Sequence, residues 1–177
     1  MFSLFFDGIQ RDLQIAILPP VLCALFRLLF IEIYREKKSP LGEWRKWYHC
    51  FRYGFWWGMD LNAYFFLLLV LLVSLPGAFL SFYYSVGDTI RQVAVTMYAI
   101  AIYTAFLGKM IFYYHYHDIF NSTLWLGKNA EKHNLLDIFF HQDHGALLLL
   151  SYIPYTLLCW WAGKVFMLIP QLPYFHV

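Results

Sequence analysis

The chain has 177 residues, of which 61% are hydrophobic, 22% aromatic and 14% charged, and its formal net charge at pH 7 is +2. A soluble domain usually has about 45–50% apolar and about 25% charged residues, so a water-soluble fold of this length would leave too much apolar surface in water. Arg and Lys show no regular spacing along a polar helix face, which argues against nucleic-acid binding. The sequence therefore predicts an all-α, polytopic membrane helical bundle.

Four apolar segments are expected to cross the membrane, because a spanning helix needs about 20 mostly apolar residues. The predicted spans are residues 13–34, 61–84, 92–114 and 145–168. The first contains Pro19, Pro20, Arg27 and Glu32, which neighbouring helices or water must accommodate. Lys109, near the end of the third, is able to extend its ammonium group to the membrane surface. The four spans form a single transmembrane domain over residues 1–177.

The segments between the spans are expected to lie at the membrane surface and to include short juxtamembrane helices. Residues 1–12 are predicted to be an amphipathic lead-in whose apolar side chains rest at the interface. Residues 85–91 are expected to form a short turn. Residues 35–59 and 115–144 are longer connections and, with four spans, they share one face of the membrane.

Five histidines fall within 30 residues in the last of these connections. They are His115, His117, His133, His141 and His144. Imidazole and carboxylate groups suit several divalent metals, so a self-contained membrane metalloenzyme is one hypothesis. No HExxH pattern is present, however, and the residues from His133 to His141 match an amphipathic helix with its His and Asp side chains in water. We favour the solvated polar face.

Residues 44–57 alternate aromatic and basic side chains, a pattern typical of the headgroup level of a membrane. A plain interfacial belt is one interpretation. The more specific one assigns Arg45 and Arg52 to an anionic lipid headgroup, because a guanidinium group binds phosphate through two hydrogen bonds. Asp60, at the start of the next span, either stabilises that helix start or forms an ion pair with Arg52.

Two stretches carry a family resemblance. They are YGFWWGMDLNAYFFLLLVLLVSLP at 53–76 and IFYYHYHDIFNSTLWLGKNAEKHNLLDIFFHQDHG at 111–145. Both are similar to segments in the N-terminal membrane region of lipoteichoic-acid-synthase-like proteins, which are bacterial phosphoglycerol transferases and sulfatase-like enzymes. The matching positions are Gly54 or Gly58, Asp60, Leu61, Tyr64, Phe112, Tyr113, His117, Asp118, Phe120 and Asn121.

The resemblance implies that this chain is a membrane anchor that presents a phosphatidylglycerol-type lipid or a cell-envelope glycopolymer to a catalytic domain. In that family a fifth span and an extracytoplasmic domain of the alkaline-phosphatase type follow, with a Thr nucleophile and a manganese-like ion. Nothing in this chain matches that domain, so we assign no catalytic residue and no cofactor here. His117, Asp118 and Asn121 are expected to face the catalytic domain or a lipid headgroup.

The resemblance also implies a location in the bacterial cytoplasmic membrane, anionic phospholipid as a partner, and self-association as a further option. It puts the connections 35–59 and 115–144 outside the cell, whereas their Lys and Arg residues favour the cytoplasmic side. We favour the outer side, where basic residues serve an anionic lipid. A small transporter or assembly factor is a third hypothesis, for which Arg27, Glu32 and Lys109 are the candidates to line a path through the bundle.

Overall fold

A computed structural model of the chain describes residues 2–34, 44–57, 59–117, 140 and 144–171. Every regular element in these residues is helical, which confirms the all-α prediction. The elements are α1 (Phe2–Ala16), α2 (Leu18–Tyr34), α3 (Trp44–Trp57), α4 (Met59–Leu69), the π-helix η1 (Val70–Ser74), α5 (Leu75–Phe79), α6 (Ser81–Tyr116) and α8 (Gly145–Met167).

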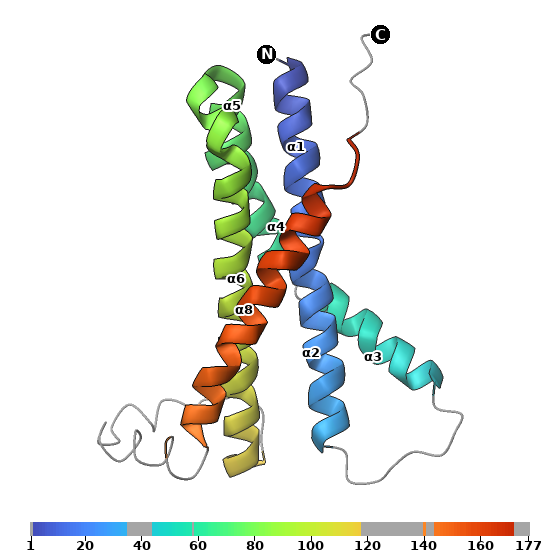
Figure 1. Cartoon of the computed structure of the whole chain (residues 1–177). Helices are drawn as coiled ribbons and strands as arrows, with labels where there is room; N and C mark the ends of the chain where they lie inside the picture. The colour runs from blue at the N-terminus through green and yellow to red at the C-terminus, as the bar shows by residue number, and fades with distance from the viewer. Residues whose placement is uncertain (1, 35–43, 58, 118–139, 141–143, 172–177) are drawn as a thin grey trace.

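Four of the described helical segments are long and apolar enough to cross a membrane, as the sequence predicts. They are Phe2–Tyr34, Met59–Phe79, Ser85–His115 and Gly145–Met167. The N-terminus, α5 and the C-terminal end of α8 lie at one end of the bundle, which we call the upper end as drawn in Figure 1. The C-terminal ends of α2 and α6 lie at the other, lower end. The molecule is thus a helical bundle of the multi-pass membrane type.

The first span is longer than the sequence suggests, because α1 and α2 form a nearly continuous helix of 33 residues. A turn at Ile17 separates the two helices, and Pro19 and Pro20 follow in the first turn of α2, where their missing N–H groups cost little. The expected interfacial lead-in is instead a bundle helix, since Asp12 and Ile15 are completely buried. Asp12 packs inside because it finds a partner there, Arg91.

The second span ends at Phe79, and not at residue 84. Its π-helix η1 closes where the N–H of Leu75 bonds to the carbonyl of Val70, just before Pro76. The chain turns at Leu80, which has an extended backbone with φ −117° and ψ 116°. Residues 85–91 are helical, and not a turn, because the polar residues of that segment are held by α1.

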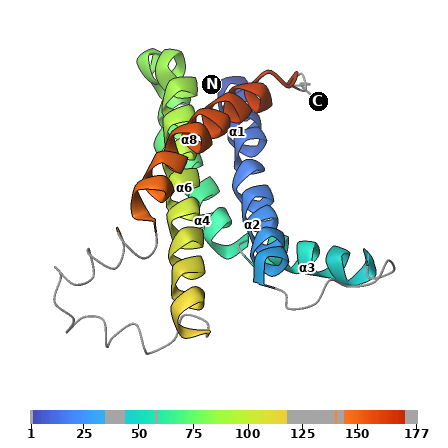
Figure 2. The same cartoon turned by 60° about the horizontal axis from the view of Figure 1, so that its bottom comes forward.

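The core lies where α1, η1, α6 and α8 meet. Its fully buried apolar side chains include Ile15, Val95, Ala99 and Cys159. Figures 1 and 2 show α8 crossing obliquely in front of α6 toward α1, with α3 slanting outward from α2. The α6–α8 contact is fixed by Gln92, whose Nε2 donates to the carbonyl of Trp160 at 2.7 Å.

Candidate functional site

The charges on α6 divide it into a hydrocarbon-spanning part and two ends. Arg91 and Lys109 are 18 residues apart in the sequence, or about 27 Å along a helix, close to the ~30 Å thickness of the hydrocarbon core. Residues 92–108, between these two cations, are uncharged. The bundle therefore carries two charged layers, an upper one at Arg91 and a lower one at Lys109, each near one boundary of the hydrocarbon.

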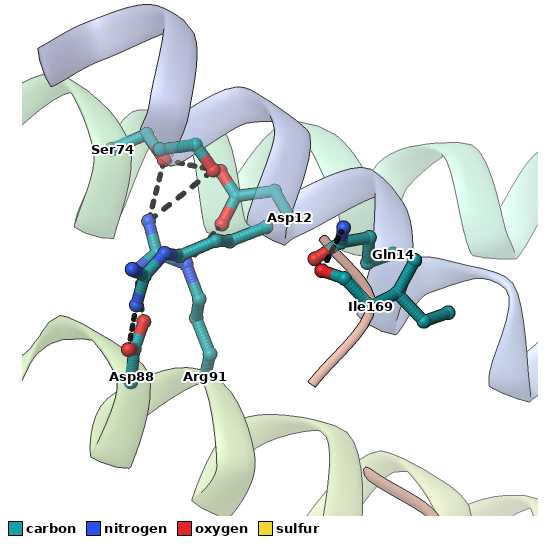
Figure 3. A network of polar contacts seen from close by, with 8 residues as sticks. Asp12, Gln14, Ser74, Asp88, Arg91 and Ile169 are labelled. Atoms are coloured by element: carbon teal, nitrogen blue, oxygen red, sulfur yellow. Dashed lines mark hydrogen bonds and ion pairs between the residues drawn. The ribbon is translucent and has the colours of Figure 1, made fainter. Parts of the chain in front are cut away.

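The upper layer is a buried polar network that joins three segments of the chain (Figure 3). Arg91 Nε donates to Asp12 Oδ1 at 2.6 Å, and Ser74 Oγ donates to Asp12 Oδ2 at 2.5 Å. Arg91 Nη2 also donates to Ser74 Oγ at 2.8 Å. The side chains of Asp12, Ser74 and Arg91 are almost completely shielded from solvent. The network thus ties α1 to η1 and α6.

A second acid and a second base extend this network toward the surface. Arg91 Nη1 donates to Asp88 Oδ1 at 3.2 Å, and Arg11 forms a further ion pair with Asp88. Two arginines and two aspartates make the cluster neutral. Ionisable groups inside a membrane bundle are costly and often functional, but here each charged group has a partner of opposite sign. This arrangement holds helices together, and it leaves no charge of the cluster unbalanced for a ligand.

Two glycines, Gly8 and Gly87, make room for the side chains of this network. A Cβ atom at Gly8 would lie 2.7 Å from Ser74 Oγ, and one at Gly87 would lie 2.9 Å from Arg91 Nη1. Both distances are too short for real atoms. The two glycines are therefore part of the network, since they let Arg91 and Ser74 reach α1.

The lower layer differs, because its two cations are not paired with any acid that the structure describes. A groove of about 460 Å³ lies between α2, α4 and α6. Its lining residues are Cys23, Phe26, Arg27, Phe30, Leu61, Tyr98, Ala101, Ile102, Ala105, Phe106 and Lys109. Arg27 and Lys109 interact electrostatically, and Lys109 Nζ lies 4.5 Å from the centre of the Phe30 ring. Neither cation forms an ion pair with an acid in the described part of the chain.

Helix α3 lies beside the lower part of α2 and packs against it. Its half-buried residues follow a helical spacing and include Trp47, Cys50, Phe51 and Phe55. Its exposed side carries both aromatic and basic side chains: Trp44, Arg45, Lys46, Tyr48, His49, Arg52, Tyr53 and Trp56. No Asp or Glu occurs within 44–57. This face therefore combines positive charge with large amphipathic rings.

The structure positions four of the six residues that the sequence assigns to lipid or domain contact. Arg45 and Arg52 are exposed on α3, and Asp60 is exposed in the first turn of α4. His117 is exposed at the end of α6, where it adopts a left-handed backbone with φ 51°. Asp118 and Asn121 lie outside the described residues.

Asp60 and His117 each have a local structural explanation. Asp60 favours the start of α4 through the helix macrodipole, and within the described residues it makes no ion pair with Arg52. The N–H of His117 donates to the carbonyl of Tyr113 at 2.9 Å, which terminates α6. Each residue thus shapes the helix end at which it lies, whatever else it contacts.

The histidine hypothesis concerns the same lower end. His115 and His117 are exposed, and His144 precedes α8 with a left-handed φ of 53°. His133 and His141 lie outside the described residues. Among the residues that are described, no group of three His, Cys, Asp or Glu side chains is placed to hold a metal ion.

The sequence did not suggest that Asp12 and Arg91 form a pair, and it grouped Arg27 with Lys109 only as candidates to line a path through the bundle. The available signal is a charged residue in or beside an apolar segment, because such a charge needs a partner, a cavity or a membrane boundary. Comparisons of the chain with protein-family models, with curated proteins and with solved structures give no match.

Proposed function

We propose that this chain is a membrane anchor that binds anionic phospholipid at its lower face and presents it to an extracytoplasmic phosphoglycerol transferase or sulfatase-like domain in the bacterial cytoplasmic membrane. The observation that carries the lipid-binding part is the exposed, acid-free, basic and aromatic face of α3. The link to a transferase comes from the sequence resemblance in 53–76 and 111–145, and it is a proposal on that basis alone.

The composition of the α3 face suits a membrane surface rather than water. Trp44 and Trp56 are 74% and 64% exposed, which is unfavourable in water but favourable at the headgroup level, where a ring has both apolar and polar surroundings. Because α3 packs along α2 through its other side, its outward rings meet lipid rather than the bundle. The helix is therefore an interfacial element.

The charges on the same face select the kind of lipid. Arg45, Lys46 and Arg52 are exposed, and each Lys or Arg near an anionic membrane surface contributes about 1 kcal/mol of attraction. A guanidinium group also binds a phosphate group in a bidentate manner. A zwitterionic headgroup offers less to these cations, since its own ammonium group competes for the phosphate.

Two of the remaining predicted residues are exposed at the ends of helices. Asp60 is exposed immediately after α3, and His117 is exposed where α6 ends at the lower end of the bundle. We propose that these two residues, with Asp118 and Asn121, face the catalytic domain or the lipid headgroup. The chain itself then supplies binding and placement, while metal-assisted phosphodiester chemistry belongs to the partner domain.

Fluorescence quenching by brominated lipid tests the lipid preference of α3. In a variant with Trp125, Trp160 and Trp161 replaced by Phe, all remaining tryptophans lie in 44–57. We expect brominated phosphatidylglycerol to quench their fluorescence more strongly than brominated phosphatidylcholine at low salt, and the difference to shrink at high salt because screening weakens surface charge interactions.

The matched variants separate charge from membrane insertion. Arg45→Gln with Arg52→Gln in this background should remove most of the preference for phosphatidylglycerol while leaving quenching by phosphatidylcholine unchanged. Lys164→Gln, a cation of α8 beside Trp160, serves as the control and should leave the preference intact. Equal quenching by both lipids before any charge is removed would contradict the proposed function.

A further inference from the structure

The groove between α2, α4 and α6 is a second candidate site, distinct from the exposed face of α3. We propose that it binds one anionic lipid within the bundle, with the phosphate headgroup held between Arg27 and Lys109 and an acyl chain lying in the groove above them. This inference uses other residues than the proposed function, and it stands or fails independently of it.

The apolar part of the groove matches an acyl chain. Apart from Arg27, Lys109 and the Tyr98 hydroxyl, its lining consists of aliphatic and aromatic side chains and Cys23. The groove is open at its side, where Leu61, Ala101 and Ala105 are exposed. A volume of about 460 Å³ lies in the range of binding sites for small molecules, which is about 300–1,000 Å³. A chain from the surrounding bilayer can therefore enter sideways.

The direction of the groove matches the orientation of a lipid in a leaflet. Lys109 lies at the lower charged layer, and Tyr98 is 11 residues before it on α6, or about 16 Å deeper in the bundle. A lipid whose phosphate sits at Lys109 thus directs its chain toward Tyr98 and the bilayer centre. It needs neither inversion nor transfer across the membrane.

The charge of the groove defines the headgroup. Arg27 and Lys109 are half-buried cations on facing helices, and no acidic residue lines the groove among those described. Two like charges placed together repel each other, and an anion between them removes that repulsion. A phosphate group fits best, because Arg supplies a bidentate contact and Lys a point charge. Stacking of Phe26 on Phe106, with centroids 4.5 Å apart, holds the two walls of the groove together.

Photolabelling locates the lipid. The full chain is placed in phosphatidylcholine nanodiscs that contain a small fraction of phosphatidylglycerol with a photoreactive acyl chain, and the labelled residues are mapped by mass spectrometry. We expect labels on the groove side of α6 between Tyr98 and Phe106, and on α2 near Phe26. Photoreactive phosphatidylcholine should label lipid-facing residues of all spans, with no preference for the groove.

Variants of the groove and of α3 test whether the labelled lipid is bound in the groove. Arg27→Gln or Lys109→Gln should lower groove labelling about fivefold each, and Arg27→Lys should retain most of it. Ala105→Phe keeps both cations but fills the groove, and it should abolish the preferential labelling of groove residues. The proposal is overturned if Arg27→Gln with Lys109→Gln leaves groove labelling unchanged, or if phosphatidylcholine labels the groove equally. Arg45→Gln with Arg52→Gln, which tests α3, should leave groove labelling in place.

Discussion

At the scale of single residues, the pair Asp12 and Arg91 explains how a charged helix joins the bundle. Removing Arg91 leaves the buried Asp12 without a cation, and removing Asp12 leaves Arg91 with only the longer contact to the more exposed Asp88. We expect Asp12→Asn to lower the free energy of unfolding by about 3–5 kcal/mol, measured by unfolding in detergent micelles. Arg91→Gln should have a similar effect, because this change also removes the hydrogen bond from residue 91 to Ser74.

The double variant and a control give this prediction its specificity. Asp12→Asn with Arg91→Gln should be less destabilised than the sum of the two single changes, because both charges are then gone. Asp7→Asn changes a half-buried acid of the same helix and should have little effect. Additive single changes, or an Asp7 variant as unstable as the Asp12 variant, would contradict the network.

In the two charged layers, the unusual charged residues can be recognised from the sequence, but the way they pair cannot. Arg27 and Lys109 are recognisable in the sequence as unusual charges within spans, but they lie 82 positions apart. Only the packing of α2 against α6 brings them to one groove, and no periodicity within a single helix encodes that packing. The same holds for Asp12 and Arg91, because the segment around Asp12 resembles an interfacial helix until its partner is known.

Among the helices, the apolar segments of the sequence predict which residues form the spans, but they do not predict well where each span ends. The polar residues around Gly87 and Asp88 predicted a turn, yet they form a helix because Arg11 and Arg91 bind Asp88. The true turn is at Leu80, an apolar residue that follows Pro76 and Gly77. The ion pairs with Arg11 and Arg91 thus stabilise a helix in a segment whose local sequence favours a turn.

The π-helix η1 is the element whose geometry matters most for the network. A π turn contains one residue more than an α-helical turn, so it shifts the face of the helix that follows it. Deleting Leu72, whose side chain is 62% exposed, should remove that extra residue and restore an α-helix. The helical parts on either side then keep their relative orientation, so Ser74 should still face Asp12 while Asn62 faces Tyr98.

We therefore expect the Leu72 deletion to keep the hydrogen bonds of Ser74. It should lower the free energy of unfolding by less than the about 1.5–3 kcal/mol that one lost hydrogen bond to a charged group would cost, measured by the same unfolding experiment. Leu72→Ala is the matched control, because it keeps the π turn and shortens only a lipid-facing side chain. A deletion variant that is less stable than Leu72→Ala by more than about 3 kcal/mol would contradict this role of the π turn.

The whole molecule is a bundle whose two ends form different faces, and the proposed function depends on this difference. The lower face carries α3, the open end of the groove at Arg27 and Lys109, and the end of α6. The upper face carries the turn at Leu80 and the ends of α1 and α8. The helical architecture followed from composition alone, whereas the side of the membrane on which each face lies did not, because the charge distribution and the family resemblance predict opposite orientations.

Labelling of single cysteines with a membrane-impermeant maleimide tests this central claim most directly. In a background without native cysteines, Trp44→Cys and His117→Cys report the lower face, and Leu80→Cys reports the upper face. The account predicts that intact bacterial cells are labelled at positions 44 and 117 but not at 80, and that inside-out vesicles give the reverse. Labelling of 44 and 80 from the same side would contradict the four-span bundle, and labelling of 44 and 117 only in inside-out vesicles would contradict an extracytoplasmic lipid-presenting face.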